Sequence, residues 1–169
     1  IKLERDMVLS GGWNSDFTDH SGYTTIDGTN DRKGIRINSG IRVTISRFVI
    51  QHASINAYLS FGGGIANFGI LTLNDSIIKD NLGPNSTAEY SYDYGAGIYN
   101  TGRLTLNNTW VKDNHANKGG GIFNAGVLTL NRSWVVENSS IEDGGGIYND
   151  RTLVSYNTSI SSNRSGSGG

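Results

Sequence analysis

Apolar and polar residues alternate in short runs along most of the chain, and asparagine or glycine separates one run from the next. In the stretch 97–114, Ile98, Leu104, Leu106 and Val111 follow this alternation. A period of two residues is typical of β-strands, whose side chains point in turn to opposite faces of a sheet. The pattern therefore predicts strands rather than helices, with these four residues and Thr109 facing inward.

The same pattern recurs at a regular interval, which is the strongest signal in the chain. The Gly-Ile pairs that open the repeat units begin at residues 34, 64, 97, 121 and 146, and the basic unit is about 24 residues long. Two consecutive units are GIYNTGRLTLNNTWVKDN and GIFNAGVLTLNRSWVVEN. The inward positions of the second of these units are Ile122, Leu128, Leu130, Ser133 and Val135. The positions expected to point outward in the first are Tyr99, Thr105, Trp110 and Lys112.

Each unit contains three short apolar runs, and a strand of three to five residues cannot bury its apolar side alone. Three such strands per unit, coiled and stacked on copies of themselves, bury all their inward side chains in one continuous core. We therefore predict an all-β, right-handed parallel β-helix with about 24 residues and three short strands per coil. It forms a single domain over residues 1–169, with opening coils in 1–32 and repeat coils in 33–169. Leucine-rich repeats have a similar period, but their L-x-x-L-x-L signature is absent.

Asparagine occurs at two equivalent positions of the repeat. It tolerates the left-handed backbone of a sharp corner, and its amide can donate to one coil and accept from the next. We expect both series to form structural ladders at the corners, with ligand binding as the less favoured alternative. The first series is Asn67, Asn100, Asn124 and Asn149, and the second is Asn81, Asn114, Asn138 and Asn163.

One unit contains about nine additional residues near 82–94, which are expected to form a loop at one corner of the coil. This loop contains Tyr90, Tyr92 and Tyr94. Tyrosine-rich loops suit contact with protein or sugar, whereas packing of the loop on its own coil is the structural alternative. Another insertion precedes Gly64, and we expect it to leave the corresponding corner one coil earlier and to touch the first loop.

Two outward rows of aromatic residues are also predicted. Tyr99, Phe123 and Tyr148 form one row, and Trp110 and Trp134 belong to the other. Aromatic rows of this kind either stack between coils or contact a partner. We treat both rows, with the tyrosine loop, as candidate contacts for a glycan or for another subunit.

The composition of the chain limits the partners and the kinds of site that can be expected. Net charge is −1 and no basic stripe is present, so nucleic acid is not an expected partner. No apolar run approaches the ~20 residues of a membrane helix, so this segment is not expected to insert into a membrane. Cysteine is absent, which excludes disulfides and thiolate sites.

A search for catalytic residues finds only weak candidates. Asp80, Asp113 and Glu137 recur at one position of the repeat, but Lys79 and Lys112 stand beside two of them, as on a solvated charged face. The three histidines lack metal-binding spacing. We therefore expect no enzymatic activity, no catalytic residue, no metal and no cofactor.

The segment GGGIYN, the LTLN segments that follow it in the repeat and the opening MVLSGGWNSDF resemble bacterial surface β-helix proteins related to the polymorphic outer-membrane-protein family. The resemblance implies export, an extracellular or cell-surface location in a bacterium, and a role in adhesion or envelope architecture. The resulting hypothesis is a non-enzymatic structural or adhesive module. The alternative is a carbohydrate-binding or polysaccharide-degrading β-helix.

The two ends of the sequence suggest a partner. Ser167-Gly168-Gly169 matches the start of another repeat unit, and Ile1-Lys2-Leu3 matches a strand. Uncapped ends of a solenoid expose a core cross-section and strand edges. We expect the module to stack end to end with more β-helix, either of a longer chain or of another copy in a filament. Surface glycans are the other expected partner.

Overall fold

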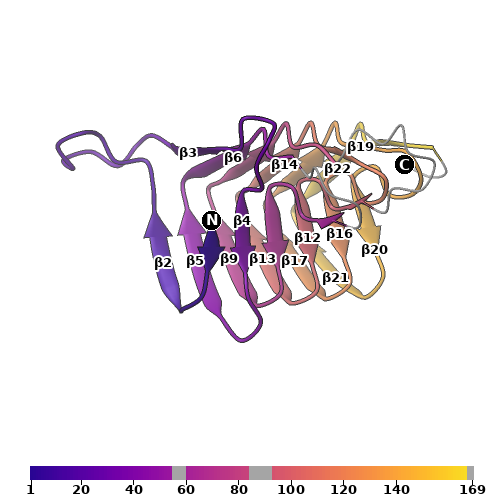
Figure 1. Cartoon of the computed structure of the whole chain (residues 1–169), viewed down its shortest axis with the longest axis horizontal. Coiled ribbons are helices and arrows are strands. Elements are labelled where there is room, and N and C mark those ends of the chain that lie inside the picture. The colour runs from indigo at the N-terminus through magenta and orange to yellow at the C-terminus, as the bar shows by residue number, and fades with distance from the viewer. Residues whose placement is uncertain (55–59, 84–92, 167–169) are drawn as a thin grey trace.

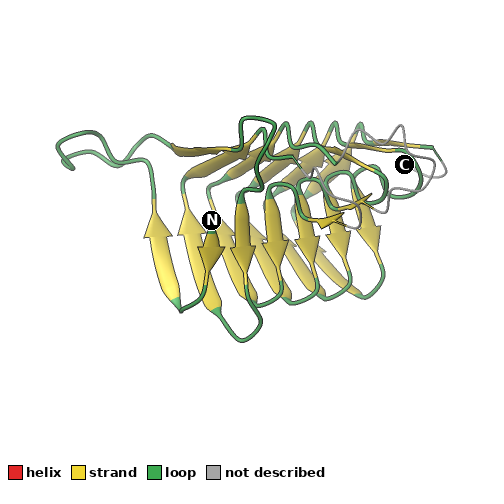
Figure 2. Cartoon of the chain, viewed as in Figure 1, coloured by secondary structure: helices red, strands yellow, loops and turns green. Residues whose placement is uncertain are grey.

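The computed structural model describes residues 1–54, 60–83 and 93–166. Over these residues the chain consists of strands and turns without a helix (Figure 2). The chain winds into six stacked coils, and each coil contributes one strand to each of three parallel sheets (Figure 1). The architecture is a right-handed parallel β-helix with three strands per coil, as predicted from the alternation.

Strands of successive coils lie side by side in the order of the sequence, as a solenoid requires. The first sheet consists of β1 (Lys2–Leu3), β4 (Ile35–Ile37), β8 (Ile65–Asn67), β12 (Ile98–Asn100), β16 (Ile122–Asn124) and β20 (Ile147–Asn149). The second sheet consists of β2 (Met7–Ser10), β5 (Arg42–Ser46), β9 (Ile70–Asn74), β13 (Arg103–Asn107), β17 (Val127–Asn131) and β21 (Thr152–Tyr156).

The third sheet completes each coil, and two small sheets lie at a corner. The third sheet consists of β3 (Thr24–Asp27), β6 (Phe48–Gln51), β10 (Ile77–Lys79), β14 (Trp110–Lys112), β18 (Trp134–Val136) and β22 (Ser159–Ser161). The small sheets are β15 (His115–Ala116) with β19 (Ser139–Ser140) and β23 (Arg164–Ser165), and β7 (Ser60–Phe61) with β11 (Asp93–Tyr94).

The register places identical repeat positions next to one another. Leu104 pairs with Leu71 on one side and with Leu128 on the other. Trp110 pairs with Trp134 in the same way. Neighbouring strands in a sheet are separated by ~4.8 Å, so each kind of side chain forms a row along the axis of the helix. A surface site on this fold is therefore lined by rows of side chains from equivalent positions of successive coils.

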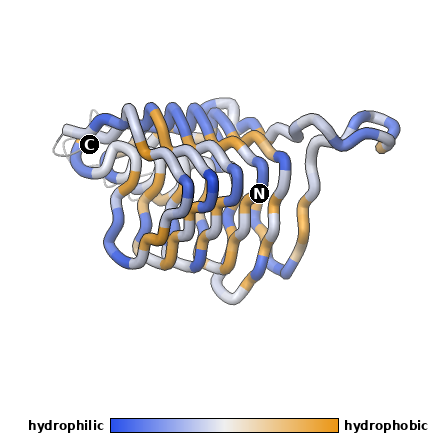
Figure 3. Tube along the Cα trace, turned by 180° about the vertical axis from the view of Figure 1, so that it is seen from behind, coloured by the Kyte–Doolittle hydropathy of each residue, from blue (hydrophilic) through white to orange (hydrophobic). Residues whose placement is uncertain are grey.

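The core contains the residues that the alternation assigned to it. Ile98, Leu104, Leu106 and Val111 are fully buried, as are the small polar side chains of Thr109 and its equivalent, Ser133. Figure 3 shows hydrophobic segments recurring in successive coils.

Ile147 occupies the repeat position of Ile98 and Ile122 and is therefore expected to be buried, which is only partly correct. This residue packs against the core but keeps some exposure. The reason is its position in the sixth coil of the structure, which has a neighbouring coil on one side only. Burial of an inward residue therefore depends on its coil as well as on its place in the repeat.

The corners differ from the prediction in one respect. The ladder asparagines do not adopt the left-handed backbone; the residue before each member of the second series does, with φ of 51° at Asp80, 54° at Asp113 and 57° at Glu137. The asparagine that follows must turn its amide inward to bond with its neighbours, so the preceding residue makes the sharp turn with its side chain in solvent. Glycine provides positive φ at another corner, as at Gly95 and Gly119.

The two insertions meet where they rejoin the coils. Strands β7 and β11 pair in parallel, with Asp93 opposite Ser60 and Tyr94 opposite Phe61. This pairing agrees with the expectation that the loops leave equivalent corners one coil apart and touch. The remainder of the insertions, which includes Tyr90 and Tyr92, lies outside the described residues.

Candidate functional site

The first asparagine series forms a continuous hydrogen-bonded ladder. Asn67 donates from Nδ2 to Oδ1 of Asn100, Asn100 donates to Asn124, and Asn124 donates to Asn149, each over 2.7 Å. The first three of these side chains are fully buried. Buried amides must be paired to avoid a desolvation penalty, so this ladder is part of the interior and not a surface that can bind a ligand.

The second series behaves in the same way at the next corner. The amides of Asn81, Asn114 and Asn138 each donate to the asparagine of the following coil, over 2.9 to 3.1 Å. The Oδ1 atom of Asn114 also accepts the backbone N–H of Asn81. Asn114 and Asn138 also donate to carbonyls of their own turns, those of Lys112 and Val136. Each amide therefore joins two coils, as the sequence predicted.

The row of Tyr99, Phe123 and Tyr148 is a stack along the axis. Ring centroids are 5.3 Å apart between Tyr99 and Phe123 and 4.9 Å apart between Phe123 and Tyr148, with interplanar angles of 15° and 11°. Phe61 and Tyr94 add a second layer, stacked on Tyr99 and Phe123 at 4.6 and 4.7 Å. Burial raises the pKa of the Tyr99 hydroxyl. These rings are occupied with one another and hold the inserted segments against the first sheet.

The two tryptophans form an equally close pair on the third sheet. Their ring centroids are 4.6 Å apart with an interplanar angle of 11°. Trp110 is 37% exposed, and a face of each ring is covered by the other. A sugar stacks on the face of an aromatic ring, and the facing surfaces of Trp110 and Trp134 are already covered.

Two of the three acids in the row at this corner pair with the lysine that precedes them. Lys79 lies 2.8 Å from Asp80, and Lys112 lies 2.9 Å from Asp113. The hydrogen bond to Asp113, with the charges of Asp80 and Glu137 nearby, raises the pKa of Lys112 above its usual value. These contacts agree with the interpretation of a solvated charged face.

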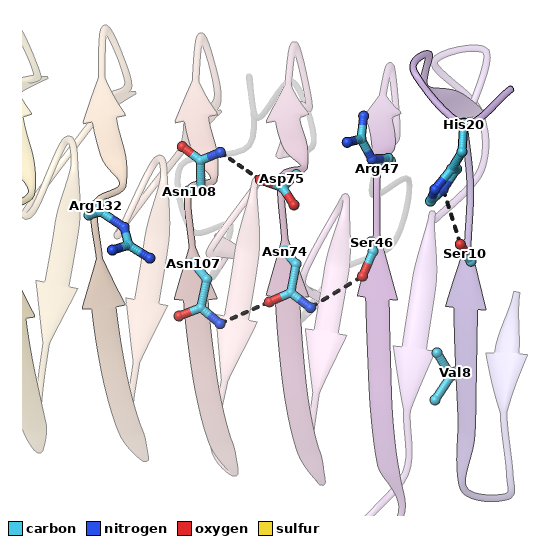
Figure 4. Close-up of a pocket in the computed structure, with 10 residues that line it drawn as sticks. All are labelled: Val8, Ser10, His20, Ser46, Arg47, Asn74, Asp75, Asn107, Asn108 and Arg132. Carbon is cyan, nitrogen blue, oxygen red and sulfur yellow. Dashed lines mark hydrogen bonds between the residues drawn. The ribbon is translucent and has the colours of Figure 1, made fainter. Parts of the chain in front are cut away.

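A polar groove of about 740 Å³ runs along the corner between the second and third sheets (Figure 4). Two parallel rows of side chains line most of it. One row lies at the ends of the second-sheet strands and consists of Ser10, Ser46, Asn74 and Asn107. The other row follows at the turn and consists of Arg47, Asp75, Asn108 and Arg132. Val8 and His20 complete the lining.

The strand-end row is a third asparagine ladder, which sequence reasoning missed. Asn107 donates from Nδ2 to Oδ1 of Asn74 over 2.9 Å, and Asn74 donates to Oγ of Ser46 over 3.2 Å. Asn131 continues it by donating to Asn107 over 2.8 Å. Unlike the two buried ladders, these amides are only partly buried. The sequence signal for this ladder was the asparagine that follows Leu-Thr-Leu in three successive units.

The turn row owes its orientation to the backbone. Arg47, Asp75, Asn108 and Arg132 all have positive φ, between 45° and 61°, so each turns the chain sharply and extends its side chain outward. Asp75 accepts a hydrogen bond of 2.6 Å from Nδ2 of Asn108. The row therefore contains two arginines and one carboxylate, and that carboxylate is engaged by an amide.

A segment between β2 and β3 forms one end of the groove. In Figure 1 it extends away from the stacked coils. His20 contacts Oγ of Ser10 at 3.1 Å and the carbonyl of Gly11 at 2.5 Å through Nε2. Trp13 stacks on its ring, with centroids 4.3 Å apart, so the imidazole is held by contacts at Nε2 and by stacking on one face.

Outside the groove, chemistry-bearing side chains are dispersed. In the described ranges, no three residues among histidine, aspartate and glutamate gather as a metal site would require. Asp27 accepts hydrogen bonds from Gln51, from the backbone of Thr29 and from His52, which together lower the pKa of its carboxyl to about 2. No helix in the described part of the chain has the length and apolarity to span a membrane.

Comparison of this chain with known proteins gives no match of any kind. No family model matches the chain. Neither the curated proteins nor the solved structures give a match.

Proposed function

We propose that this chain is a non-enzymatic structural and adhesive module of an extracellular or cell-surface protein. The observation that supports this proposal is that repeated side chains are engaged mainly with copies of themselves. Asparagine amides bond to asparagine amides in the buried ladders, and aromatic rings stack on aromatic rings. Such rows rigidify a solenoid along its axis.

A rod of this kind suits a spacer or display role. Its length grows by one strand spacing, ~4.8 Å, with each coil, and its three sheets give continuous lateral faces. A surface role is also what the resemblance of the sequence motifs to bacterial surface β-helix proteins implies.

The placement of the carboxylates supports a non-catalytic role. Hydrolytic and lyase sites need carboxylates clustered in one place with distinct environments. Here Asp80 and Asp113 occupy equivalent corners and pair with adjacent lysines. Equivalent groups in equivalent surroundings do not divide into an acid and a base.

Two measurements on the purified chain test this proposal. The chain is incubated with acidic and neutral polysaccharides, and we expect no increase in reducing ends or in unsaturated products over a blank. Beads coated with the folded chain should resist detachment by flow from a surface coated with bacterial envelope polysaccharide, whereas beads coated with heat-denatured chain should not. Turnover that is lost on Asp80→Asn or Asp113→Asn would contradict the non-enzymatic role, and equal detachment of both bead types would contradict adhesion.

Carbohydrate binding is the second candidate function. The groove favours it, because rows of amide and hydroxyl groups lining an elongated depression suit a polymer with many hydroxyls. The aromatic rows favour it less, because their rings already stack on one another.

A further inference from the structure

We propose that the groove between the second and third sheets binds an extended acidic polysaccharide along the axis of the β-helix. The proposal stands on the groove itself and does not depend on the adhesive role above. The binding site is formed by the strand-end row and the turn row defined in Figure 4.

The repeat of the groove matches a linear polysaccharide. The second, third and fourth coils each line the groove with one strand-end side chain and one turn side chain, and coils recur every ~4.8 Å. This spacing is close to the length of one pyranose ring in an extended chain. From Ser10 in the first coil to Arg132 in the fifth, the lining spans successive coils without interruption. A sugar polymer laid along it therefore meets a polar side chain at successive rings.

The amides retain hydrogen-bonding capacity that the ladder does not use. Nδ2 of Asn107 has two hydrogens, and one of them is donated to Asn74. The Oδ1 atom of Asn107 accepts from Asn131 and has a second lone pair. Because these side chains are partly exposed, the second hydrogen and lone pair can reach hydroxyls of a ligand. The ladder thus fixes the amides in orientations that are repeated from coil to coil.

The charges in the groove favour an acidic sugar. Arg47 and Arg132 lie three coils apart, about 14 Å at the usual strand spacing. Arg132 is exposed and makes no ion pair within the described ranges. A guanidinium binds a carboxylate through two parallel N–H donors. Two arginines and a single aspartate, Asp75, line the groove, so its formal charge is positive although the chain carries a charge of −1.

The same charges disfavour nucleic acid as the ligand. A nucleic acid has a phosphate at every nucleotide, and its affinity comes mainly from many lysine and arginine contacts. Two arginines in five coils, with a carboxylate between them, do not match that density. Bases of single strands also need exposed aromatic platforms, and the groove lining contains no aromatic ring besides His20.

The experiment measures binding by isothermal titration calorimetry with three defined probes. These are a hexamer of galacturonate, its fully methyl-esterified form and a short oligo-dT. The critical variant is Arg132→Asn. Asparagine occupies the equivalent corner as Asn108 and Asn157, with φ of 49° and 50°, so the backbone is expected to be retained while the guanidinium is removed. Arg103→Gln is the matched control, because Arg103 is exposed on the same sheet outside the groove.

We expect the wild-type chain to bind the acidic hexamer, with at least a tenfold loss of affinity in Arg132→Asn and no more than a twofold change in Arg103→Gln. The methyl ester should bind at least tenfold more weakly than the acid. Circular dichroism confirms that each variant is folded. The proposal is overturned by failure of the acidic hexamer to bind, by equal binding of the ester, by an Arg132→Asn variant that binds like wild type, or by oligo-dT binding as tightly as the hexamer. Failure of the galacturonate hexamer to bind would leave the adhesive role standing, because the bead assay uses bacterial envelope polysaccharide and reports on the whole chain.

Discussion

Asparagine has a different role in each of the three ladders, and the difference lies in burial. In the first series Asn100 is fully buried and accepts from Asn67 while donating to Asn124. In the groove, Asn107 makes the same kind of contact but remains partly exposed. The same amide pairing is therefore structural in the core and available to a ligand at the surface.

The buried ladder should be sensitive to loss of one member. Asn100→Ala removes the partner of two neighbouring amides and of the Val127 carbonyl. Because each buried polar group left without a partner costs about 1–3 kcal/mol, we expect the free energy of unfolding to fall by about 3 kcal/mol in urea titrations. Asn149→Ala, at an exposed position of the same ladder, serves as control and should cost less than about 1 kcal/mol. Equal losses would show that the ladder does not act through burial.

A second prediction at this scale concerns pH. The hydrogen bonds from Gln51, Thr29 and His52 lower the pKa of Asp27 from 3.8 to about 2 in the folded chain. A lowered pKa means that the ionised carboxylate stabilises the fold above pH 3.8, and that this contribution is lost as the pH falls toward 2. The effect should be small because Asp27 is exposed. We expect Asp27→Asn to lower Tm at neutral pH, and the gap to wild type to narrow between pH 4 and pH 2. A gap that is constant across this range would contradict the assignment.

At the scale of elements, the rows of aromatic rings connect strands that the backbone already pairs. Trp110 and Trp134 are partners in register and their rings are nearly parallel. Two indoles at this distance couple electronically, which should give an exciton couplet in the far-ultraviolet circular dichroism spectrum. We expect Trp134→Phe to abolish the couplet and to cost about 1 kcal/mol of stability. Trp13→Phe, which leaves the pair intact, should preserve it.

The inward faces of these strands could be predicted from the sequence, because the same inward positions recur as apolar residues in each repeat unit. Leu104 and Leu128 occupy one position of the unit, and alternation alone assigned both to the core, where they are fully buried. The two buried ladders followed from the same periodicity, since an asparagine at a corner of every coil has its nearest partners in the adjacent coils.

Features that depend on the corners were predicted less well. The left-handed residue is Asp113 and not Asn114. The repeat pattern does not distinguish these two positions, because a shift of one residue at a turn leaves the repeat unchanged. The groove was missed because Arg47 and Arg132 lie far apart in sequence and differ from the other residues in their row, Asp75 and Asn108. Periodicity reports what coils share, whereas a binding site depends on where they differ.

At the scale of the whole molecule, stability should vary from coil to coil. Each coil contacts only its neighbours, so the chain approximates a one-dimensional array. Inward residues of the fourth coil, such as Ile98 and Leu104, are fully buried, whereas Ile160 in the sixth coil is 48% exposed. The middle coils therefore lose contacts on two sides when they open, and the sixth coil loses them on one.

This difference predicts a gradient of amide protection. In hydrogen exchange of this chain followed by mass spectrometry, peptides covering β20 to β22 should exchange faster than peptides covering β12 to β14, since local opening is less costly where fewer contacts are lost. Leu104→Ala should cost about 2–5 kcal/mol and speed exchange in the coils on both sides. Ile160→Ala should speed exchange in the sixth coil and leave the fourth unchanged. Uniform exchange of all coils in both variants would mean that the coils open together, and the nearest-neighbour description of this β-helix would then be wrong.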